Sequence, residues 1–184
     1  MSFRDCTARK SCAKFSAGIA HQEETGQEAY PTQTGREAFR TRGTMPEILL
    51  AEDNPADVYL IREALHEHGV DCALRVAADG KDVMTLLSGE GAPPDLMILD
   101  LNLPRHDGIE ILQRVRATDG MAHIPVVVLT SSDSPRDRQV AIQLGATRYI
   151  KKPSSLEQFL ELGAVFKELL AAHESRSKES ANEA

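Results

Sequence analysis

Hydrophobic and polar positions form alternating blocks between residues 45 and 172, and each block has the length of one strand or one helix. Short, nearly continuous apolar runs are typical of strands that are covered on both faces of a sheet. Such runs predict five strands, over residues 47–52, 72–77, 95–100, 124–130 and 147–150. Between them, apolar residues recur at helical spacing and predict five helices, over 55–69, 81–88, 109–117, 134–146 and 156–172.

The first predicted helix has clear signals at both ends. Asn54 is a favoured N-cap residue, and Pro55 suits the first helical position. Gly69 is expected to end the helix. In the last predicted helix, Gly163 lies inside the helical pattern, where glycine costs about 1 kcal/mol relative to alanine. We therefore predict a local weakness at Gly163.

The alternation of strands with helices predicts the fold class. Five strands and five helices fit one doubly wound α/β domain, in which a five-stranded parallel sheet carries helices on both faces. We place this domain at residues 45–172.

The two ends of the chain lack this pattern. Residues 1–44 hold seven Lys or Arg and five Asp or Glu, so their charge is +2 and that of the remainder is −9. A segment with so little apolar surface to bury is expected to be disordered, and we interpret it as an inert extension. A transit peptide, or a true start at Met45, is the alternative. Residues 173–184 are expected to form a flexible tail.

The composition argues against several classes of function. The chain has 184 residues, of which 41% are hydrophobic and 27% charged, as in soluble globular proteins. Its net charge of −7 argues against nucleic-acid binding, which needs clustered Lys and Arg. No apolar run approaches the ~18 residues of a membrane-spanning helix. Cys6, Cys12 and Cys72 are odd in number and widely scattered, so they are interpreted as reduced thiols of a cytoplasmic protein. A metal site of Cys6, Cys12 and His21 is disfavoured, because their spacing matches no common zinc pattern and a fourth ligand is missing.

Polar residues gather at the predicted strand ends. The first strand ends in Glu52 and Asp53, and the third runs without a polar break into Asp100. Thr130 ends the fourth strand, and Lys152 follows the fifth. Each residue alone is more often a helix cap or a solvated side chain. In an open parallel sheet, however, ligands bind beyond the carboxyl ends of the strands, so their recurrence there indicates a site.

The residue types at these ends fit phosphoryl chemistry assisted by a metal ion. Carboxylates that share one site repel each other, by about 4 kcal/mol for two charges ~4 Å apart at an effective dielectric near 20. Either one carboxyl group keeps its proton or a cation binds, and hard oxygen ligands suit Mg²⁺. Lysine supplies a point charge and threonine a hydroxyl donor, and both suit phosphoryl oxygens.

Four segments carry a resemblance to a known family: ILLAEDNPADVYLIREAL, LMILDLNLPRHDGIEIL, IPVVVLTSS and ATRYIKKP. In this order they resemble the receiver domain of two-component response regulators, over about residues 46–171. The motifs EDNPADV, DLNLPR and VVVLTSS are most similar to single-domain regulators of the cyanobacterial phytochrome-associated type. The resemblance implies a flavodoxin-like receiver fold for the predicted sheet.

The resemblance also implies how the acidic residues would act. Asp100 would be the phosphoacceptor, which attacks a phosphohistidine on a partner kinase. The cofactor would be Mg²⁺, held by Glu52, Asp53, Asp100 and the backbone carbonyl of Asn102. Phosphotransfer and autodephosphorylation would be the only reactions, so the protein would be a signalling protein rather than an enzyme.

Three further residues would form the switch that the resemblance implies. Thr130 would bond the phosphoryl group, Lys152 would pair with it, and Tyr149 would turn inward as Thr130 moves. Two residues depart from the family pattern. His106 stands where methionine is common and is interpreted as a tolerated loop residue, with tuning of the loop near neutral pH as the alternative. Lys151 adds a second cation, and strand alternation is expected to put it on the opposite side from Lys152.

The partners follow from the same resemblance. The phosphoryl donor would be a sensor histidine kinase, for example of the phytochrome type, or a phosphotransfer protein. Since no output domain is recognised after residue 172, the readout is expected to be protein–protein contact or phosphate relay, without nucleic acid or membrane. A homodimer would form through the fourth helix, fifth strand and fifth helix. Ile142, Phe159 and Phe166 are apolar candidates for this face, and they divide between core and interface.

Two other classes of function compete with this interpretation. An aspartate-nucleophile phosphatase would need a second acid two residues after the nucleophile, where this chain has Asn102. A scaffolding domain that only resembles a receiver would not need the complete set of Asp53, Asp100, Thr130 and Lys152.

Overall fold

The computed structural model describes residues 45–89 and 91–182. The strands are β1 (Glu47–Ala51), β2 (Ala73–Ala77), β3 (Leu96–Leu99), β4 (Val126–Thr130) and β5 (Arg148–Lys151). The helices are α1 (Pro55–Glu67), α2 (Gly80–Leu87), α3 (Gly108–Ala117), α4 (Pro135–Gln143), α5 (Leu156–Leu160) and α6 (Leu162–Asn182). The predicted disorder of residues 1–44 lies outside the described residues.

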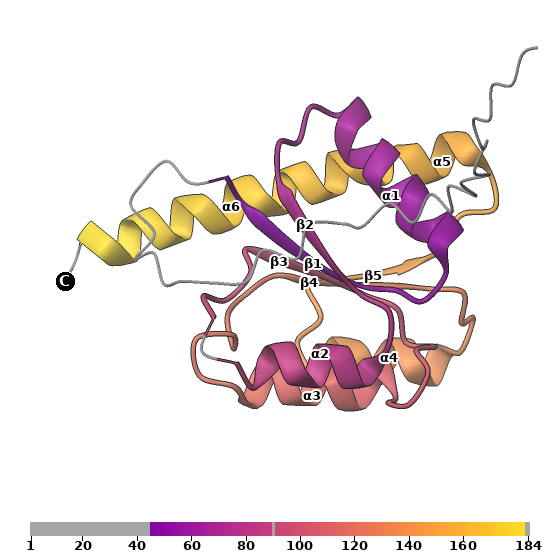
Figure 1. Cartoon of the computed structure of the whole chain (residues 1–184), viewed down its shortest axis with the longest axis horizontal. Helices are drawn as coiled ribbons and strands as arrows, with labels where there is room; N and C mark the ends of the chain where they lie inside the picture. Colours follow the sequence, from indigo (N-terminus) through magenta and orange to yellow (C-terminus); the bar gives the residue numbers. More distant parts are fainter. Residues whose placement is uncertain (1–44, 90, 183–184) are drawn as a thin grey trace, which may run out of the picture. The chain divides into compact units, whose positions relative to one another are not determined.

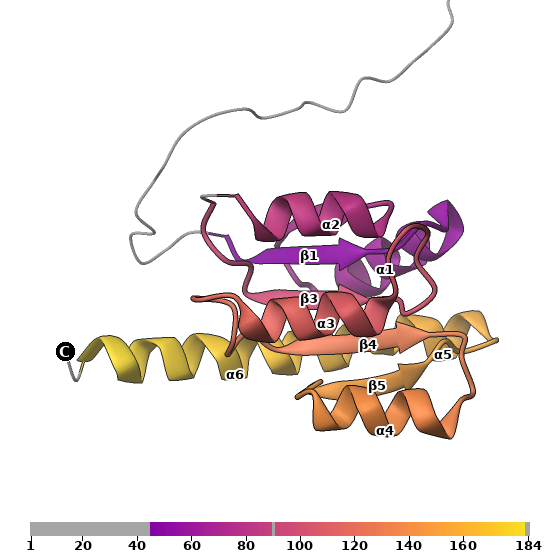
Figure 2. The same cartoon turned by 90° about the horizontal axis from the view of Figure 1, so that it is seen from below.

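The five strands form one parallel sheet in the order β2-β1-β3-β4-β5. Helices α1, α5 and α6 lie on one face of this sheet, and α2, α3 and α4 lie on the other (Figure 1). Seen from the α2–α4 side, β1, β3, β4 and β5 lie side by side and point the same way (Figure 2). The prediction of a doubly wound, flavodoxin-like sheet is confirmed. Its strand order reverses between β1 and β3, where such folds bind ligands.

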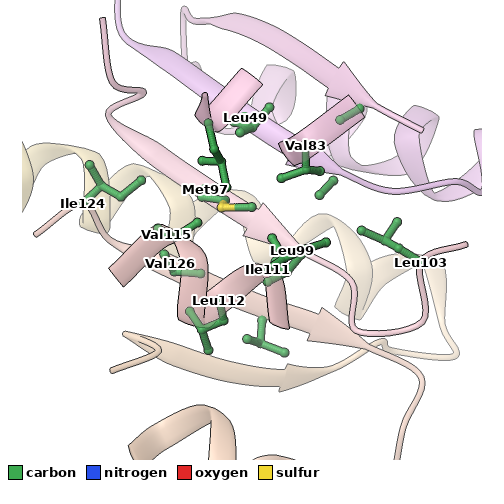
Figure 3. Packing of buried hydrophobic residues seen from close by; sticks show 14 of the residues in the cluster. Leu49, Val83, Met97, Leu99, Leu103, Ile111, Leu112, Val115, Ile124 and Val126 are labelled. Carbon is green, nitrogen blue, oxygen red and sulfur yellow. The ribbon is translucent and has the colours of Figure 1, made fainter. Parts of the chain in front are cut away.

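The core is divided by the sheet into two apolar clusters. In β3, Met97 and Leu99 pack with the cluster under α2 and α3, whereas Leu96 and Ile98 pack with the cluster under α1 and α6. Figure 3 shows the first cluster, with Met97 and Leu99 at its centre. Because successive strand residues point to opposite faces, both faces are buried only if every position is apolar. The continuous apolar run before Asp100 is therefore explained by the central position of β3, which is covered on both faces.

Helix α1 begins as the sequence predicts. The Asn54 side chain accepts a hydrogen bond from the backbone N–H of Ala56 at 3.0 Å, and Pro55 occupies the first helical position. This cap lies three residues after the end of β1, so the first turn of α1 starts beside the carboxyl end of the sheet. That position brings Asp57, an acidic residue of the first turn, close to the strand ends.

The final helix differs from the single helix predicted over 156–172. It is divided at Glu161 into α5 and α6, and the N–H of Ala164 bonds the carbonyl of Glu161, three residues back. Such a bond is typical of a tighter, 3₁₀-like turn. The turn lies where Gly163 packs on α1, because a Cβ at Gly163 would collide with the carbonyl oxygen of Ala64. The glycine that predicted a weak point is thus the site of a close helix–helix contact.

Helix α6 also continues to Asn182, beyond the predicted start of the tail at residue 173. The side chains of residues 173–179 are mostly exposed, and Lys178 lies 2.6 Å from Glu174, one turn earlier. Helix-forming residues and such pairs explain a helix that no apolar stripe predicts. The flexibility of residues 173–184 stays a prediction. Although α6 has 21 residues, neither it nor any other described helix is apolar enough to cross a membrane.

Candidate functional site

Three buried polar residues mark the carboxyl ends of the central strands. Glu52 follows β1, Asp100 follows β3 and Thr130 ends β4; their exposed fractions are 2%, 4% and 0%. Within the part of the chain that the structure describes, they are the only buried polar or charged residues. Ala51 pairs with Leu99 in the sheet, so the carboxylates that follow them lie on adjacent strands. Burial of this kind is costly unless the groups are partnered.

Glu52, Asp53 and Asp100 form a group that we call the carboxylate cluster. Each residue offers one oxygen, and these oxygens all lie within 4.8 Å of one another. Asp53 is exposed, so water and ions reach the cluster from its side. An all-oxygen ligand set of this kind fits a hard divalent cation such as Mg²⁺. The residues present therefore suit the cation that the sequence predicts.

Lys152 is bound by three carboxylates at once. Its Nζ lies 2.7 Å from Asp100 Oδ2, 2.7 Å from Glu52 Oε2 and 2.8 Å from Asp57 Oδ2. Burial alone would lower the pKa of Lys152, but the hydrogen bonds that its ammonium group donates to these carboxylates outweigh burial and raise the pKa above its usual value. The backbone N–H of Lys152 also donates to the carbonyl of Thr130 at 2.8 Å, which ties the lysine to the end of β4.

Glu52 has the most restricted environment in the carboxylate cluster. Burial raises the pKa of its carboxyl group, and the bond from Lys152 lowers it only in part. The other oxygen, Oε1, accepts a hydrogen bond from the backbone N–H of Asn54 at 3.2 Å. A raised pKa favours the protonated carboxyl group, because burial disfavours the charged form.

The structure brings Lys152 and not Lys151 to the carboxylate cluster. The Nζ of Lys151 lies 2.5 Å from Oδ2 of Asp133, and both side chains are exposed. The other departure from the family pattern, His106, has its Nδ1 3.4 Å from Oε2 of Glu110 at the start of α3. The roles of Lys151 and His106 stay predictions.

Asp57 is the site residue that the sequence analysis missed. It lies 95 positions from Lys152 in the chain and resembles any acidic residue in the first turn of a helix. Such residues usually stabilise the helix through its dipole, so the pattern gave no reason to single it out. The only signal in the sequence was the position of α1, which begins shortly after Glu52 and Asp53 at the end of β1.

The hydroxyl group of Thr130 is held by two donors. Its Oγ1 accepts hydrogen bonds from Asn102 Nδ2 at 3.1 Å and from the backbone N–H of Ser132 at 3.2 Å. Both bonds use the oxygen as acceptor, so the hydroxyl proton can still be donated. The backbone N–H of Asn102 donates to Oδ1 of Asp100 at 3.0 Å. Asn102 therefore links Asp100 to Thr130, and its carbonyl as a metal ligand stays a prediction.

Tyr149 lies at the edge of the same site. Its ring is partly buried against the cluster under α2 and α3, and its hydroxyl lies 3.4 Å from the carbonyl oxygen of Ser132. Burial raises the pKa of this hydroxyl, so it stays a donor at neutral pH. The backbone N–H of Ser132 donates to the Thr130 hydroxyl, so Ser132 links the side chains of Tyr149 and Thr130.

The loop after Asp100 is fixed by close backbone packing. A Cβ at Gly108 would lie 2.5 Å from Leu101 Cα and 2.8 Å from the carbonyl oxygen of Asp100, so only glycine fits there. Arg105 has a φ of 74°, in the left-handed region, and its guanidinium lies 2.7 Å from Oδ2 of Asp79. These contacts pack the loop from Leu101 to Gly108 against the backbone that follows Asp100 and against Asp79.

The comparisons with known proteins agree with this arrangement. The model of the response regulator receiver domain matches residues 48–163. The transcriptional regulatory protein TrcR of Mycobacterium tuberculosis is 40% identical over 121 residues, which are 66% of this chain and 45% of TrcR. This chain thus covers less than half of TrcR. Response regulator Rcp1 of Synechocystis is 36% identical over 120 residues, which are 62% of this chain and 82% of Rcp1.

A solved structure shows the same relationship. The phosphorylated cyanobacterial phytochrome response regulator RcpA superposes with a TM-score of 0.64 at 35% identity, over 70% of this chain and 95% of RcpA. The predicted similarity to phytochrome-associated regulators is therefore confirmed. With its matching motifs, sheet order and strand-end residues, this chain belongs to the response regulator receiver domain family.

Proposed function

We propose that Asp100 of this response regulator accepts a phosphoryl group from a phosphohistidine of a sensor histidine kinase or a phosphotransfer protein. One observation carries the proposal: Asp100 belongs to the carboxylate cluster and is also bound by Lys152 at 2.7 Å. A single carboxylate thus faces both a cation-binding set and a fixed ammonium group. Receiver domains use this combination to accept phosphate, so the protein is a signalling phosphoacceptor.

The proposed transfer needs little covalent chemistry from the other residues. A carboxylate oxygen of Asp100 forms a bond to phosphorus while the P–N bond of the phosphohistidine breaks. The imidazole nitrogen leaves with the bonding electron pair, and an acyl phosphate remains on Asp100. Positioning and neutralisation of charge dominate such reactions. Lys152 supplies a positive charge, and the Thr130 hydroxyl supplies a hydrogen bond to a phosphoryl oxygen.

The same proposal assigns Mg²⁺ to the carboxylate cluster. Glu52, Asp53 and Asp100 would hold the ion together with the backbone carbonyl of Asn102. Rcp1 has been solved in a Mn²⁺-bound form, and it is 34% identical to this chain over 64% of this chain's length. This likeness supports a divalent cation at the carboxylate cluster. When bound, Mg²⁺ would offset the negative charge of the phosphoryl oxygens.

Phosphorylation would act as a switch through Thr130 and Tyr149. The phosphoryl group adds about two negative charges and three acceptor oxygens. Hydrogen bonds from Thr130 and Lys152 to it would contribute about 1.5–3 kcal/mol each, or about 3–6 kcal/mol together. Reversing an equilibrium from about 1:99 to 99:1 takes about 5.5 kcal/mol. A shift of Thr130 would reach Tyr149 through Ser132, which contacts both side chains.

The partners and the location are also proposals. RcpA is a phytochrome response regulator, and its 35% identity to this chain supports a phytochrome-type kinase as the phosphoryl donor. A homodimer through the surface of α4, β5 and the final helix, which comprises α5 and α6, would transmit the signal. The half-buried thiol of Cys72 is free, which fits a reducing cytoplasm.

A phosphatase that uses an aspartate nucleophile is disfavoured by Asn102. In such an enzyme, an acid at this position would protonate the leaving group. The amide of Asn102 cannot serve as that acid, and it donates its hydrogen bonds to Thr130 and Ser131. We therefore propose no catalytic turnover beyond transfer to Asp100 and its slow hydrolysis.

The direct test is phosphorylation of the Asp100→Asn variant. Acetyl phosphate with Mg²⁺ should label the wild-type protein with a base-labile phosphoryl group, and Asp100→Asn should remain unlabelled in intact-mass spectra. The matched control is Asp119→Asn, since Asp119 is an exposed loop residue away from the strand ends. Chelation of Mg²⁺ should suppress labelling of the wild type. Labelling of Asp100→Asn at the wild-type level would refute the proposal.

A further inference from the structure

Asp57 stands apart from the other carboxylates that bind Lys152. The three carboxylates, on Glu52, Asp57 and Asp100, match the three N–H donors of the ammonium group. Glu52 and Asp100 also belong to the carboxylate cluster, whereas Asp57 does not. Asp57 is therefore the one partner of Lys152 whose oxygens are not shared with the candidate cation site.

This difference matters when the site is loaded. A divalent cation held by the carboxylate cluster would draw on the oxygens of Glu52 and Asp100 and would repel the ammonium group. The lysine side chain has four flexible carbons, so an ammonium group that loses its partners can leave the site. Asp57 lies in the first turn of α1, three residues after the Asn54 cap, and its 2.8 Å contact with Nζ would not compete with a cation held by the cluster.

We propose that Asp57 is a positioning residue for Lys152. It holds one N–H of the ammonium group and thereby directs the remaining donors toward Asp100 and a phosphoryl group on it. The inference rests on the proposed function of Asp100 and Lys152. Asp57 itself need not touch the phosphoryl group, and its effect passes entirely through the lysine.

A purely structural role for Asp57 makes a different prediction. An acidic residue in the first turn stabilises a helix through the helix dipole, whatever the lysine does. Asp82 offers a matched control, since it lies three residues after its N-cap in α2, as Asp57 does in α1, and it is exposed. Replacement of either aspartate removes a first-turn charge, but only Asp57 contacts Lys152 in the described structure.

The test is a double-mutant cycle read by the affinity for beryllium fluoride, a phosphoryl mimic, with Mg²⁺ present. Calorimetry on the full chain would compare Asp57→Asn and Asp82→Asn, each with Lys152 and with Lys152→Ala. In the Lys152 background, Asp57→Asn should weaken binding about tenfold, since the lost bond joins two charged groups. In the Lys152→Ala background, Asp57→Asn should not weaken binding further. Asp82→Asn should leave the affinity unchanged in both backgrounds.

The outcomes separate this inference from the function on which it rests. An equal loss in both lysine backgrounds, or no loss in either, would overturn the positioning role of Asp57. Failure of the wild type itself to bind beryllium fluoride would instead refute the phosphoacceptor function. A second cycle uses urea unfolding without Mg²⁺ and needs no ligand. Coupling between Asp57→Asn and Lys152→Ala is expected there, and additive effects would contradict the contact.

Discussion

Lys151 and Lys152 are neighbours in the chain, yet their ammonium groups bind carboxylates in different parts of the structure. The Nζ of Lys152 lies 2.7 Å from Asp100, with 12% of its side chain exposed. The Nζ of Lys151 lies 2.5 Å from Asp133, with 58% of its side chain exposed. Since successive residues of an extended strand point to opposite sides, the end of β5 can present only one lysine to the site.

The two lysines are therefore expected to differ sharply when each is replaced by alanine. Lys152→Ala should still take up phosphate on Asp100 but should fail to switch, because the phosphoryl oxygens lose their fixed cation. Lys151→Ala should match the wild type, since it loses only an exposed ion pair of about 0–1 kcal/mol. Phosphorylation by acetyl phosphate measures uptake, and NMR shifts around Tyr149 measure switching. Exchanged phenotypes would show that Lys151 is the functional lysine.

A second prediction concerns Gly163→Ala, for which helix propensity and packing predict opposite changes in the free energy of unfolding. Propensity alone predicts that Gly163→Ala stabilises α6 by about 1 kcal/mol. The contact with the Ala64 carbonyl predicts instead a loss of about 1–3 kcal/mol, because α6 must move away from α1. Urea unfolding measures the difference. Gly89→Ala is the control, since a Cβ there would lie 3.5 Å from the nearest atom, an ordinary contact. A more stable Gly163→Ala would show that α6 shifts freely.

The two lysines and Gly163 show which features of the structure could be predicted from the sequence pattern. Strand positions follow from apolar runs such as Leu96–Leu99, because a central strand buries both faces and leaves no other choice of residue. The carboxylates at the strand ends can be predicted as well, because an acidic residue directly after a buried apolar strand, such as Asp100, is costly to bury and therefore indicates a site. The packing of Gly163 could not be predicted, because its neighbour, Ala64, lies about a hundred positions earlier in the chain. A local pattern records the cost of glycine in a helix but not the helix packed against it.

The same limit applies to the site. The side of the strand that carries Lys152 could be predicted, since alternation along β5 is local. The contact between Asp57 and Lys152 could not be predicted, because it joins the first helix to the residue after the last strand and neither residue type is unusual at its position. The extension of α6 past residue 173 was missed for the opposite reason, because its helix is stabilised locally and carries no apolar stripe.

Deletion of residues 1–44 tests the boundary of the domain. The buried hydrophobic residues that the structure describes run from Ile48 to Leu170, so the shortened chain keeps this whole core. Its melting temperature and its labelling by acetyl phosphate should match those of the full chain. A longer deletion, of residues 1–50, removes most of β1 and should prevent folding, which calibrates the assay. A loss of more than a few degrees on the shorter deletion would show that the segment packs on the domain.

The last prediction concerns the proposed dimer, whose apolar candidates the structure divides. Phe159 and Phe166 belong to the core, with exposed fractions of 3% and 0%, whereas Ile142 on α4 is 54% exposed. Ile142 is thus the candidate that can contact a second copy, on the surface of α4, β5, α5 and α6 that carries Tyr149. An isologous pair would bury it twice, once from each subunit. Phosphorylation is expected to strengthen association, because Tyr149 connects this surface to Thr130 through Ser132.

Sedimentation of the protein with and without beryllium fluoride measures this association. Ile142→Ser should weaken the dimer at least about tenfold, since burial of such a side chain contributes about 1.5–3 kcal/mol. Tyr59→Ser is the control, because Tyr59 is also large and is 61% exposed but lies on α1, outside the proposed surface. The control should leave the dimer unchanged. A monomer in both states at tens of micromolar would refute the dimer and leave the kinase as the partner of the switched surface.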